Sequence, residues 1–186
     1  MAVNPGATPG AAGTVRPMTA ADVAPALAWR NHPAVRAVMF TQHEITLEES
    51  RRWFELASAD PLRHLLIFEQ GGVPTGFAGL ARRADAPAEA DWGFYVAPDA
   101  PRGSGTALGL AVLEHAFGAL GLQAVHGAVL AFNDRSLRLH ERLGFRRSGE
   151  DGAPVLVDGR PQAVIRFVLR RADWRAAALA LSSAGH

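Results

Sequence analysis

The residues best suited to chemistry in this sequence form a glycine-rich turn between a strand and a helix. The turn reads Arg102-Gly103-Ser104-Gly105-Thr106-Ala107, and an apolar segment with helical spacing follows it over residues 108–120. Small side chains leave the backbone N–H groups of a turn open to a ligand, and the start of a helix adds partial positive charge. Together these properties predict a binding site for the pyrophosphate group of a nucleotide.

Two common nucleotide-binding loops do not fit this turn. A Rossmann loop needs a third glycine where this sequence has Leu108, and a Walker loop needs a lysine, which the turn lacks. What remains is a pattern of three residues. Arg102 is followed, after two intervening residues, by Gly105, and Gly105 is followed, after one intervening residue, by the small residue Ala107. This pattern resembles the acetyl-CoA pyrophosphate loop of the GNAT superfamily of N-acetyltransferases. An ordinary glycine-rich turn between a strand and a helix is the alternative.

The elements around the turn predict an α/β fold with a mixed sheet. Residues 91–96 favour a strand because most are aromatic or β-branched, and Pro98 and Pro101 end it. Upstream, Thr19 and Thr46 are N-cap candidates, each with an acidic residue three positions later. The expected elements are strands 14–17, 64–69, 75–82, 124–131, 145–147 and 163–170, and helices from Thr19 to Pro33, 34–40, from Thr46 through Leu56, 108–120, 134–143 and from Trp174 onward.

A second motif lies about 30 residues after the turn, in residues 133–145. It reads Asn-Asp-Arg-Ser-Leu-Arg-Leu-His-Glu-Arg-Leu-Gly-Phe, with Asn133 as a helix N-cap and Gly144 as the helix end. This segment resembles the second signature of the same superfamily. Two motifs in this order are far more specific than either alone. The resemblance implies the GNAT fold, a mixed, mostly antiparallel sheet of about seven strands with a splayed centre, flanked by helices.

Composition restricts the class of protein further. The chain has 19 basic and 18 acidic residues and a net charge of +1, so nothing indicates a nucleic-acid surface or an electrostatic membrane anchor. The absence of cysteine excludes disulfides, thiolate metal sites and a cysteine nucleophile, and the seven histidines show no spacing typical of metal ligands. We expect no metal and, by default, a cytoplasmic protein.

We interpret residues 1–13 as a disordered tail, 14–175 as one acetyltransferase domain, and 176–186 as a fraying C-terminal helix. The sequence does not determine the oligomeric state, and a homodimer is compatible with it.

The N-terminal half resembles one group within the superfamily, the pseudaminic acid biosynthesis acetyltransferases. The resemblance is carried by Trp29-Arg30-Asn31-His32-Pro33, Gln42-His43, Trp53-Phe54 and Trp92-Gly93-Phe94-Tyr95. Those enzymes acetylate the 4-amino group of a UDP-linked 4-amino-4,6-dideoxy sugar. The resemblance therefore implies a small-molecule partner, a nucleotide-linked amino sugar, with acetyl-CoA as co-substrate.

The resemblance also assigns coenzyme contacts residue by residue. The superfamily binds pantetheine through the strand before the loop, here Phe94, Tyr95 and Val96. The N–H groups from Arg102 to Ala107 are expected to bind the pyrophosphate, with Arg102 adding a charge-assisted contact. Asn133 is expected either to contact the pantetheine arm or only to cap its helix, and the two roles are compatible.

Two residues are candidates for proton transfer. His140 stands where many superfamily members have a tyrosine that protonates the departing thiolate, so it is either the proton donor or a structural or coenzyme-contacting histidine. An acidic base expected on the fifth strand would fall near Ala128, which cannot accept a proton. Asp91, at the start of the central strand, is a possible substitute, acting directly or through water, and otherwise a solvated edge carboxylate.

The acceptor is expected to meet the segment that closes over it in this superfamily. Its candidates are Arg30, suited to a diphosphate or else to a surface ion pair, His32 and His43. Trp92 is a candidate for stacking on uracil or sugar, and otherwise a core residue. Two other classes remain open: an acetyltransferase for ribosomal proteins, small amines or antibiotics, and a non-catalytic acyl-CoA-binding module.

Overall fold

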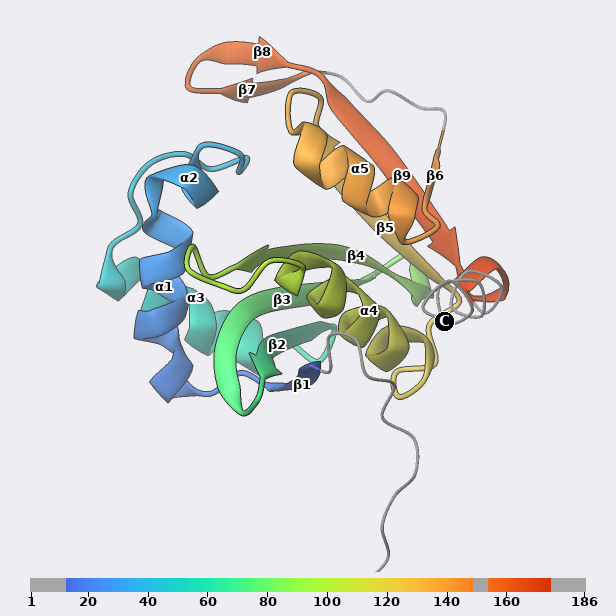
Figure 1. Ribbon diagram of the computed structural model, residues 1–186, viewed down its shortest axis with the longest axis horizontal. Coiled ribbons are helices and arrows are strands. Elements are labelled where there is room, and N and C mark those ends of the chain that lie inside the picture. The colour runs from blue at the N-terminus through green and yellow to red at the C-terminus, as the bar shows by residue number, and fades with distance from the viewer. Residues whose placement is uncertain (1–12, 149–153, 175–186) are drawn as a thin grey trace, which may run out of the picture.

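A seven-stranded sheet forms the centre of the protein (Figure 1), whose computed structural model describes residues 13–148 and 154–174. The strands are β1 (Gly13–Pro17), β2 (Arg63–Gln70), β3 (Val73–Arg83), β4 (Ala86–Val96), β5 (Ala124–Leu130), β6 (Arg146–Arg147) and β9 (Val164–Arg170). Their spatial order is β1-β2-β3-β4-β5-β9-β6, and every neighbouring pair is antiparallel except β4 and β5. The expected mixed, mostly antiparallel sheet of about seven strands is confirmed.

A separate hairpin projects beyond the end of β9. It consists of β7 (Val155–Val157) and β8 (Arg160–Gln162), joined by a turn in which Asp158 and Gly159 both have positive φ. Neither of these two strands is among the elements expected from the sequence. Gly13, assigned to the tail from sequence, is the first residue of β1, while the rest of that tail and the predicted helix beyond Trp174 lie outside the described residues.

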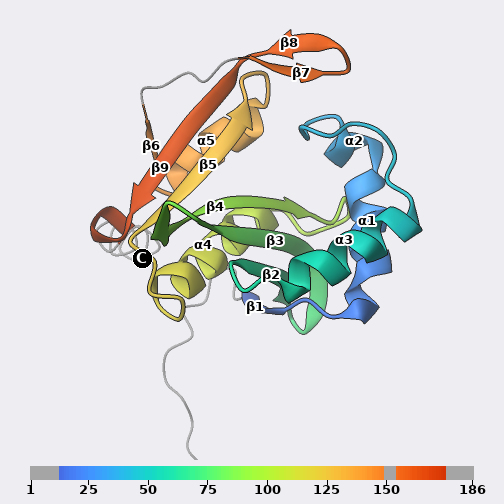
Figure 2. The same ribbon diagram turned by 180° about the vertical axis from the view of Figure 1, so that it is seen from behind.

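The two central strands separate after a short paired segment. β4 and β5 pair only at Glu89 with Ala124, Ala90 with Val125, and Asp91 with His126. Beyond that point they diverge, so that β5 and β9 run away from the rest of the sheet (Figures 1 and 2). We call the region where residues 92–96 of β4 and 127–130 of β5 no longer pair with each other the wedge. It corresponds to the splayed centre that the resemblance implied.

The part of the chain that the structure describes contains several helical segments with defined bounds. They are η1 (Ala20–Asp22), α1 (Val23–Asn31), α2 (Pro33–Arg36), α3 (Leu47–Ala59), α4 (Ser104–Phe117) and α5 (Asp134–Arg142). Helices α4 and α5 lie on one face, as Figure 1 shows, whereas α1 and α3 lie on the other face over β2 to β4. Seen from behind in Figure 2, none of the labelled helices lies in front of β5 and β9.

The core follows from the alternation of side chains along the strands. Leu66 and Phe68 pack under α4, whereas Ile67 between them packs against α1 on the opposite face. Helix α4 is buried along most of its length, with Leu108 and Leu113 fully inaccessible, which explains its apolar sequence. The strongest packing therefore fixes α4, and the loop that precedes it, against the sheet.

The helix ends are set by the residues that the sequence indicated. Thr46 Oγ1 accepts from the Glu49 N–H and the Glu49 carboxylate accepts from the Thr46 N–H (3.2 and 2.7 Å), a complete capping box. Helix α2 is shorter than the expected 34–40, because the chain leaves the helix after Arg36. The side chain of Gln42 then donates to the Ala37 carbonyl at 3.0 Å, which stabilises that exit.

Candidate functional site

The loop between β4 and α4 presents three backbone N–H groups without a partner. Among the described residues, the amides of Arg102, Gly103 and Gly105 have no hydrogen-bond acceptor. The Ser104 N–H donates to the Pro101 carbonyl, and the N–H groups of Thr106 and Ala107 donate to the Gly103 carbonyl. Gly103, with φ of +92°, is the N-cap of α4, a conformation that favours glycine. The loop thus offers free donors at the positive end of a 14-residue helix.

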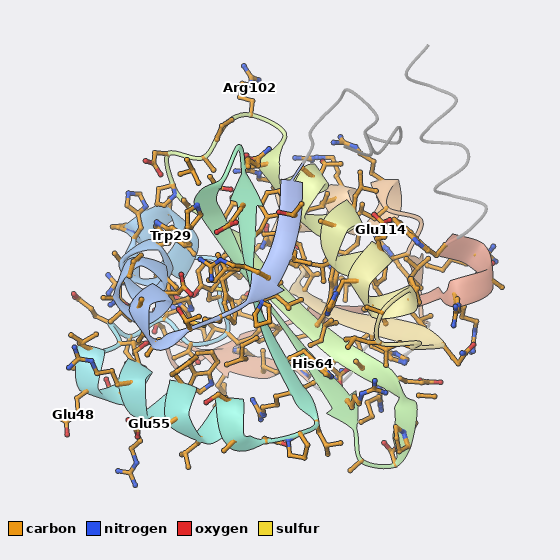
Figure 3. The ribbon with its side chains drawn as sticks, turned by 90° about the horizontal axis from the view of Figure 1, so that it is seen from below. Trp29, Glu48, Glu55, His64, Arg102 and Glu114 are labelled. Carbon is orange, nitrogen blue, oxygen red and sulfur yellow. The ribbon has the colours of Figure 1, made fainter. Side chains whose placement is uncertain are left out.

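The side chains of the loop divide into buried and exposed ones. Ser104 is buried, and its Oγ lies 2.7 Å from the Pro101 carbonyl and 2.5 Å from the Gln70 amide oxygen, so this residue braces the loop. Arg102 is exposed, and Figure 3 shows it at the outer end of the loop, pointing away from the protein. The arginine is therefore free to approach an anionic ligand at the loop.

The wedge contains an open strand edge next to this loop. The Ala97 N–H donates to the Thr75 carbonyl of β3 at 2.8 Å. Because the direction of the peptide groups alternates along a strand, those of Phe94 and Val96 point away from β3 into the wedge, while that of Tyr95 points to β3. The peptide groups of Phe94 and Val96 are therefore free to hydrogen-bond an extended ligand, whereas the Tyr95 backbone is already used in the sheet.

Tyr95 contributes its ring to the opposite face of the sheet. Its hydroxyl donates to the Ala26 carbonyl at 3.3 Å, and burial raises the pKa of the phenol. The ring packs at 5.2 Å from that of Phe77. Tyr95 thus joins the sheet to α1 and lines two cavities on that face.

His140 is buried behind the wedge with both ring nitrogens engaged. The Trp92 indole N–H donates to Nε2 at 3.1 Å, so the proton of the neutral ring lies on Nδ1, which donates to the Ser136 carbonyl at 2.8 Å. The side chain is 3% exposed, and burial lowers the pKa of His140. A neutral histidine without a free nitrogen fits the structural role better than that of a proton donor.

Trp92 belongs to the same buried group and not to an acceptor site. Its ring stacks on Phe145 at 5.0 Å and is 7% exposed. Gly127 makes this arrangement possible, because a Cβ there would lie 2.6 Å from His140 Nε2. Of the two roles that the sequence left open for Trp92, the geometry supports the core one. Asn133 caps α5, its Oδ1 accepting from the Ser136 N–H at 3.1 Å.

Two adjoining cavities open on the face covered by α1 and α3. Their volumes are about 390 and 290 Å³, and both are lined by Arg30, Trp53, Phe77 and Tyr95. The larger also contacts His43, and the smaller reaches Asp91 and Gly93 on β4. A Cβ on Gly93 would meet no atom within 4 Å, so the smaller cavity has free space beside the wedge.

Arg30 lies between these cavities with part of its guanidinium unpaired. Its Nη2 donates to the Thr41 carbonyl at 2.7 Å, whereas Nη1 is buried and has no hydrogen-bond partner among the described residues. Burial lowers the pKa of Arg30, because the charged form loses hydration. A partly buried cation with an unused donor is a site where an anionic ligand group would be stabilised.

The other predicted acceptor and base residues are placed differently. His43 joins Arg30 in the larger cavity, but His32 is exposed and caps α2, its Nδ1 accepting from the Ala34 N–H at 3.3 Å. Asp91 lies on the wall of the smaller cavity, largely exposed, 3.7 Å from the Arg83 guanidinium. The structure therefore places Arg30 with His43 in the larger cavity and with Asp91 in the smaller one, and leaves His32 and Trp92 outside both.

Sequence reasoning missed one pair of side chains near the wedge. His126 Nε2 lies 2.5 Å from a carboxylate oxygen of Glu89, and both side chains are partly exposed. The two residues are 37 positions apart, and only the parallel pairing of β4 with β5 brings them together. No local sequence signal could have found them.

Two general properties concern the described residues as a whole. No group of three or more His, Cys, Asp or Glu side chains among them is arranged to hold a metal ion. Within 13–148 and 154–174, no helix combines the length and the apolar character needed to cross a bilayer.

Comparison with known proteins places this geometry in a family. Residues 14–146 match the acetyltransferase (GNAT) domain family. An uncharacterized N-acetyltransferase of Bacillus subtilis strain 168, YokL, derived from the SPbeta prophage, is 44% identical over 86 residues, 45% of this chain and 49% of the relative. The chain thus matches about half the length of that relative.

Two solved structures are similar over most of the chain. A spermidine N-acetyltransferase from Vibrio cholerae in complex with CoA and spermine is 19% identical, with a TM-score of 0.79 over 88% of this chain and 98% of its own. The aminoglycoside acetyltransferase AAC(6')-Ib in complex with coenzyme A is 21% identical, with a TM-score of 0.73 over 89% and 98%. The fold is therefore shared with both. With its splayed sheet, its glycine-containing loop before α4 and the family match over residues 14–146, this chain belongs to the GNAT acetyltransferases.

Proposed function

We propose that this protein is an N-acetyltransferase that transfers acetyl from acetyl-CoA directly to a primary amine within a ternary complex. The unpartnered amides of Arg102, Gly103 and Gly105 support pyrophosphate binding. The open edge at Phe94 and Val96 supports an extended pantetheine arm lying in the wedge. The solved relatives bound to CoA share the fold, which supports the same coenzyme here.

The chemistry then follows from the position of the wedge. An N–H of β4 that faces the wedge can polarise the thioester carbonyl and stabilise the oxyanion that forms on attack. The amine approaches from the face of the smaller cavity, over Gly93, where no side chain intervenes. Its nitrogen forms a bond to the acetyl carbon, the carbon–sulfur bond breaks, and CoA leaves as the thiolate, while the proton that the attached nitrogen loses as it becomes an amide passes to solvent. CoA thiolate is a fair leaving group, so the buried His140 need not protonate it.

We infer that the acceptor is a nucleotide-linked 4-amino sugar, and one observation carries this part of the proposal. The Arg30 guanidinium lies between two cavities with a buried, unpartnered Nη1, and the aromatic rings of Trp53, Phe77 and Tyr95 surround it. A planar guanidinium binds phosphate oxygens well, and aromatic rings pack on sugar and base faces. A diphosphate would satisfy the free donor of Arg30.

The same observation disfavours strongly cationic acceptors. Spermidine and aminoglycosides, which the names of the two solved relatives specify, carry several positive charges at neutral pH. Two carboxylates also line the cavities: Glu49 in the larger, where it accepts hydrogen bonds from the N–H and the hydroxyl of Thr46, and Asp91 in the smaller, where the Arg83 guanidinium lies 3.7 Å away. An unpaired arginine next to a polycation would cost free energy through like-charge repulsion.

The experiment is an acceptor panel read by release of the CoA thiol with a disulfide reagent. The chain contains no cysteine, so the protein adds no background to this signal. The panel contains a UDP-4-amino-4,6-dideoxy sugar, spermidine, an aminoglycoside and a short peptide. We expect the highest kcat/KM for the UDP sugar. A higher value for spermidine or the aminoglycoside would overturn the acceptor assignment, and no thiol release with any amine would overturn the enzymatic one.

Arg30→Gln tests whether the arginine acts as inferred. We expect a decrease in kcat/KM for the UDP sugar of about 10- to 100-fold, the range that hydrogen bonds to a charged partner provide. The matched control is Arg36→Gln, because Arg36 lies on the neighbouring helix α2 and pairs with Glu44 at 3.6 Å outside the two cavities. Equal losses in both variants would contradict a specific role for Arg30.

A further inference from the structure

The acceptor amine must lose a proton, and none of the candidate groups considered above is well placed to accept it. An alkyl amine is largely protonated at neutral pH and must lose a proton before or as it attacks the thioester. His140 has no free nitrogen, Ala128 has no titratable group, and Asp91 is exposed next to Arg83. The structure offers a different group at the base of the wedge.

Glu89 and His126 face the same side of the sheet as the two cavities. Ala90 and Trp92 of β4 pack in the core under α4, so Glu89 and Asp91, which alternate with them, face the opposite side. On β5, Val125 and Val129 pack in that core, so His126 and Ala128 face away from it. His126 is in register with Asp91, the last paired residue before the wedge opens.

This position is close to the path of the amine. Neighbouring strands are about 4.8 Å apart and alternate residues of a strand about 6.7 Å. His126 therefore lies one strand from Asp91, which is two residues from the open space over Gly93. Ala128, the next residue of β5 on this face, is exposed and carries only a methyl group. One bridging water can span the remaining distance.

The hydrogen bond with Glu89 determines which ring nitrogen of His126 carries the proton. A carboxylate only accepts, so the Nε2–H of His126 donates to Glu89 at 2.5 Å, and the lone pair of the neutral ring is on Nδ1. Among the described residues, Nδ1 has no hydrogen-bond partner. The side chains are 22% and 30% exposed, so the pair is reachable from solvent but held in place by the strands.

We propose that His126 Nδ1 accepts the proton of the acceptor ammonium, directly or through one water, and that Glu89 positions the ring and balances its charge. The ammonium becomes a neutral amine and His126 becomes an imidazolium hydrogen-bonded to the Glu89 carboxylate. The amine then attacks the acetyl carbon as described, and the imidazolium returns its proton to solvent. His126 is thus a catalytic residue and Glu89 a positioning residue. This inference rests on the proposed acetyl transfer but not on the identity of the amine.

The charged groups around the pair are few and come from three strands. Asp91 is the register neighbour on β4, and Arg83 of β3 pairs with it. On β9, Arg166 and Arg170 lie opposite Ala128 and Ala124, on either side of His126. The pH dependence of the rate must be read against these groups.

The experiment compares pH–rate profiles of variants with any amine that the wild type acetylates. We expect His126→Gln to lower kcat by about 10²- to 10⁴-fold, the range of general-base catalysis, and to remove the acidic limb of the kcat/KM profile. Glu89→Gln should give a smaller loss and move that limb to lower pH. Imidazole in the buffer should partly restore His126→Gly. His115→Gln, on α4, is the matched control and should keep the wild-type profile.

Two results would overturn the proposal. One is a His126→Gln enzyme within threefold of the wild type with its acidic limb intact. The other is loss of that limb in Asp91→Asn but not in His126→Gln, which would assign the base to Asp91. Stabilisation by acetyl-CoA, measured as a shift in Tm, shows that each variant is folded and binds the co-substrate. If the wild type acetylates no amine, the proposed function fails and not this inference alone.

Discussion

Adding one methyl group at Gly127 tests how rigidly the buried Trp92–His140 pair is held. A Cβ at Gly127 would lie 2.6 Å from His140 Nε2, 2.9 Å from His140 Cδ2 and 3.0 Å from Trp92 Nε1. The His140 ring is fixed by the Ser136 carbonyl and by the rings of Phe145 and Phe167 at 5.0 and 4.9 Å. It cannot move away without losing these contacts.

The magnitude follows from what the methyl group displaces. Leaving the Trp92 N–H and the His140 Nε2 without partners costs about 1–3 kcal/mol for each buried group. Overpacking in a close-packed core costs about 1–3 kcal/mol more. These contributions overlap, because movement of the ring relieves the clash as it breaks the hydrogen bond. We expect Gly127→Ala to reduce the free energy of unfolding by about 3 kcal/mol, and the Tm by about 6–12 °C in a chain of this size.

The assay is thermal unfolding followed by circular dichroism, with Gly93→Ala as the matched control. Gly93 is also a glycine within a central strand, but a Cβ there meets no atom within 4 Å. Its Tm should stay within about 2 °C of the wild type, as expected for substitutions that disturb no packing. A Gly127→Ala protein that unfolds within 1 °C of the wild type would refute the view that the Trp92–His140 pair is rigidly held.

Two further predictions concern pH and the coenzyme loop. Burial lowers the pKa of His140, His64 and His115, so below about pH 6.5 the unfolded chain binds more protons than the folded one and stability falls as the pH is lowered. Between pH 7.5 and pH 5 the wild type should therefore lose more Tm than His140→Gln, and equal losses would mean that His140 does not contribute. Arg102→Ala should weaken acetyl-CoA binding roughly three- to tenfold, because the exposed guanidinium adds charge to the helix terminus, and the loss should shrink in high salt. Unchanged affinity in calorimetry at low salt would contradict a contact with Arg102.

Much of the fold was predictable because local signals were strong and agreed with one another. The capping box of Thr46 and Glu49, the proline-ended strand before Arg102 and the Asn133 cap each mark an element boundary through backbone hydrogen bonds that neighbouring residues complete. Their order along the chain specified an α/β sheet. The loop before α4 was predictable for the same reason, since its sequence determines its own backbone.

The remaining features depend on pairing between distant segments. The Arg16 guanidinium bonds Asp22 at 2.8 Å and Glu69 at 2.7 Å, joining β1, η1 and β2, yet the sequence gives no sign of this network. The Trp92–His140 bond spans 48 positions. Sequence reasoning left each of these two residues open between a site role and a structural one, because it could not see that their side chains bond to each other. Long-range register, and not residue type, determined their roles.

The wedge also bears on edge-to-edge pairing of sheets between copies of the protein. Unpaired peptide groups such as those of Phe94 and Val96 are what a strand from another chain would need in order to extend a sheet, and proteins normally shield such edges at their periphery. Here the unpaired edge lies in the interior of the sheet, between β4 and β5, with further strands on both sides of it. The divergence of two strands thus creates a strand-like docking edge away from the periphery, where sheets of different molecules would meet.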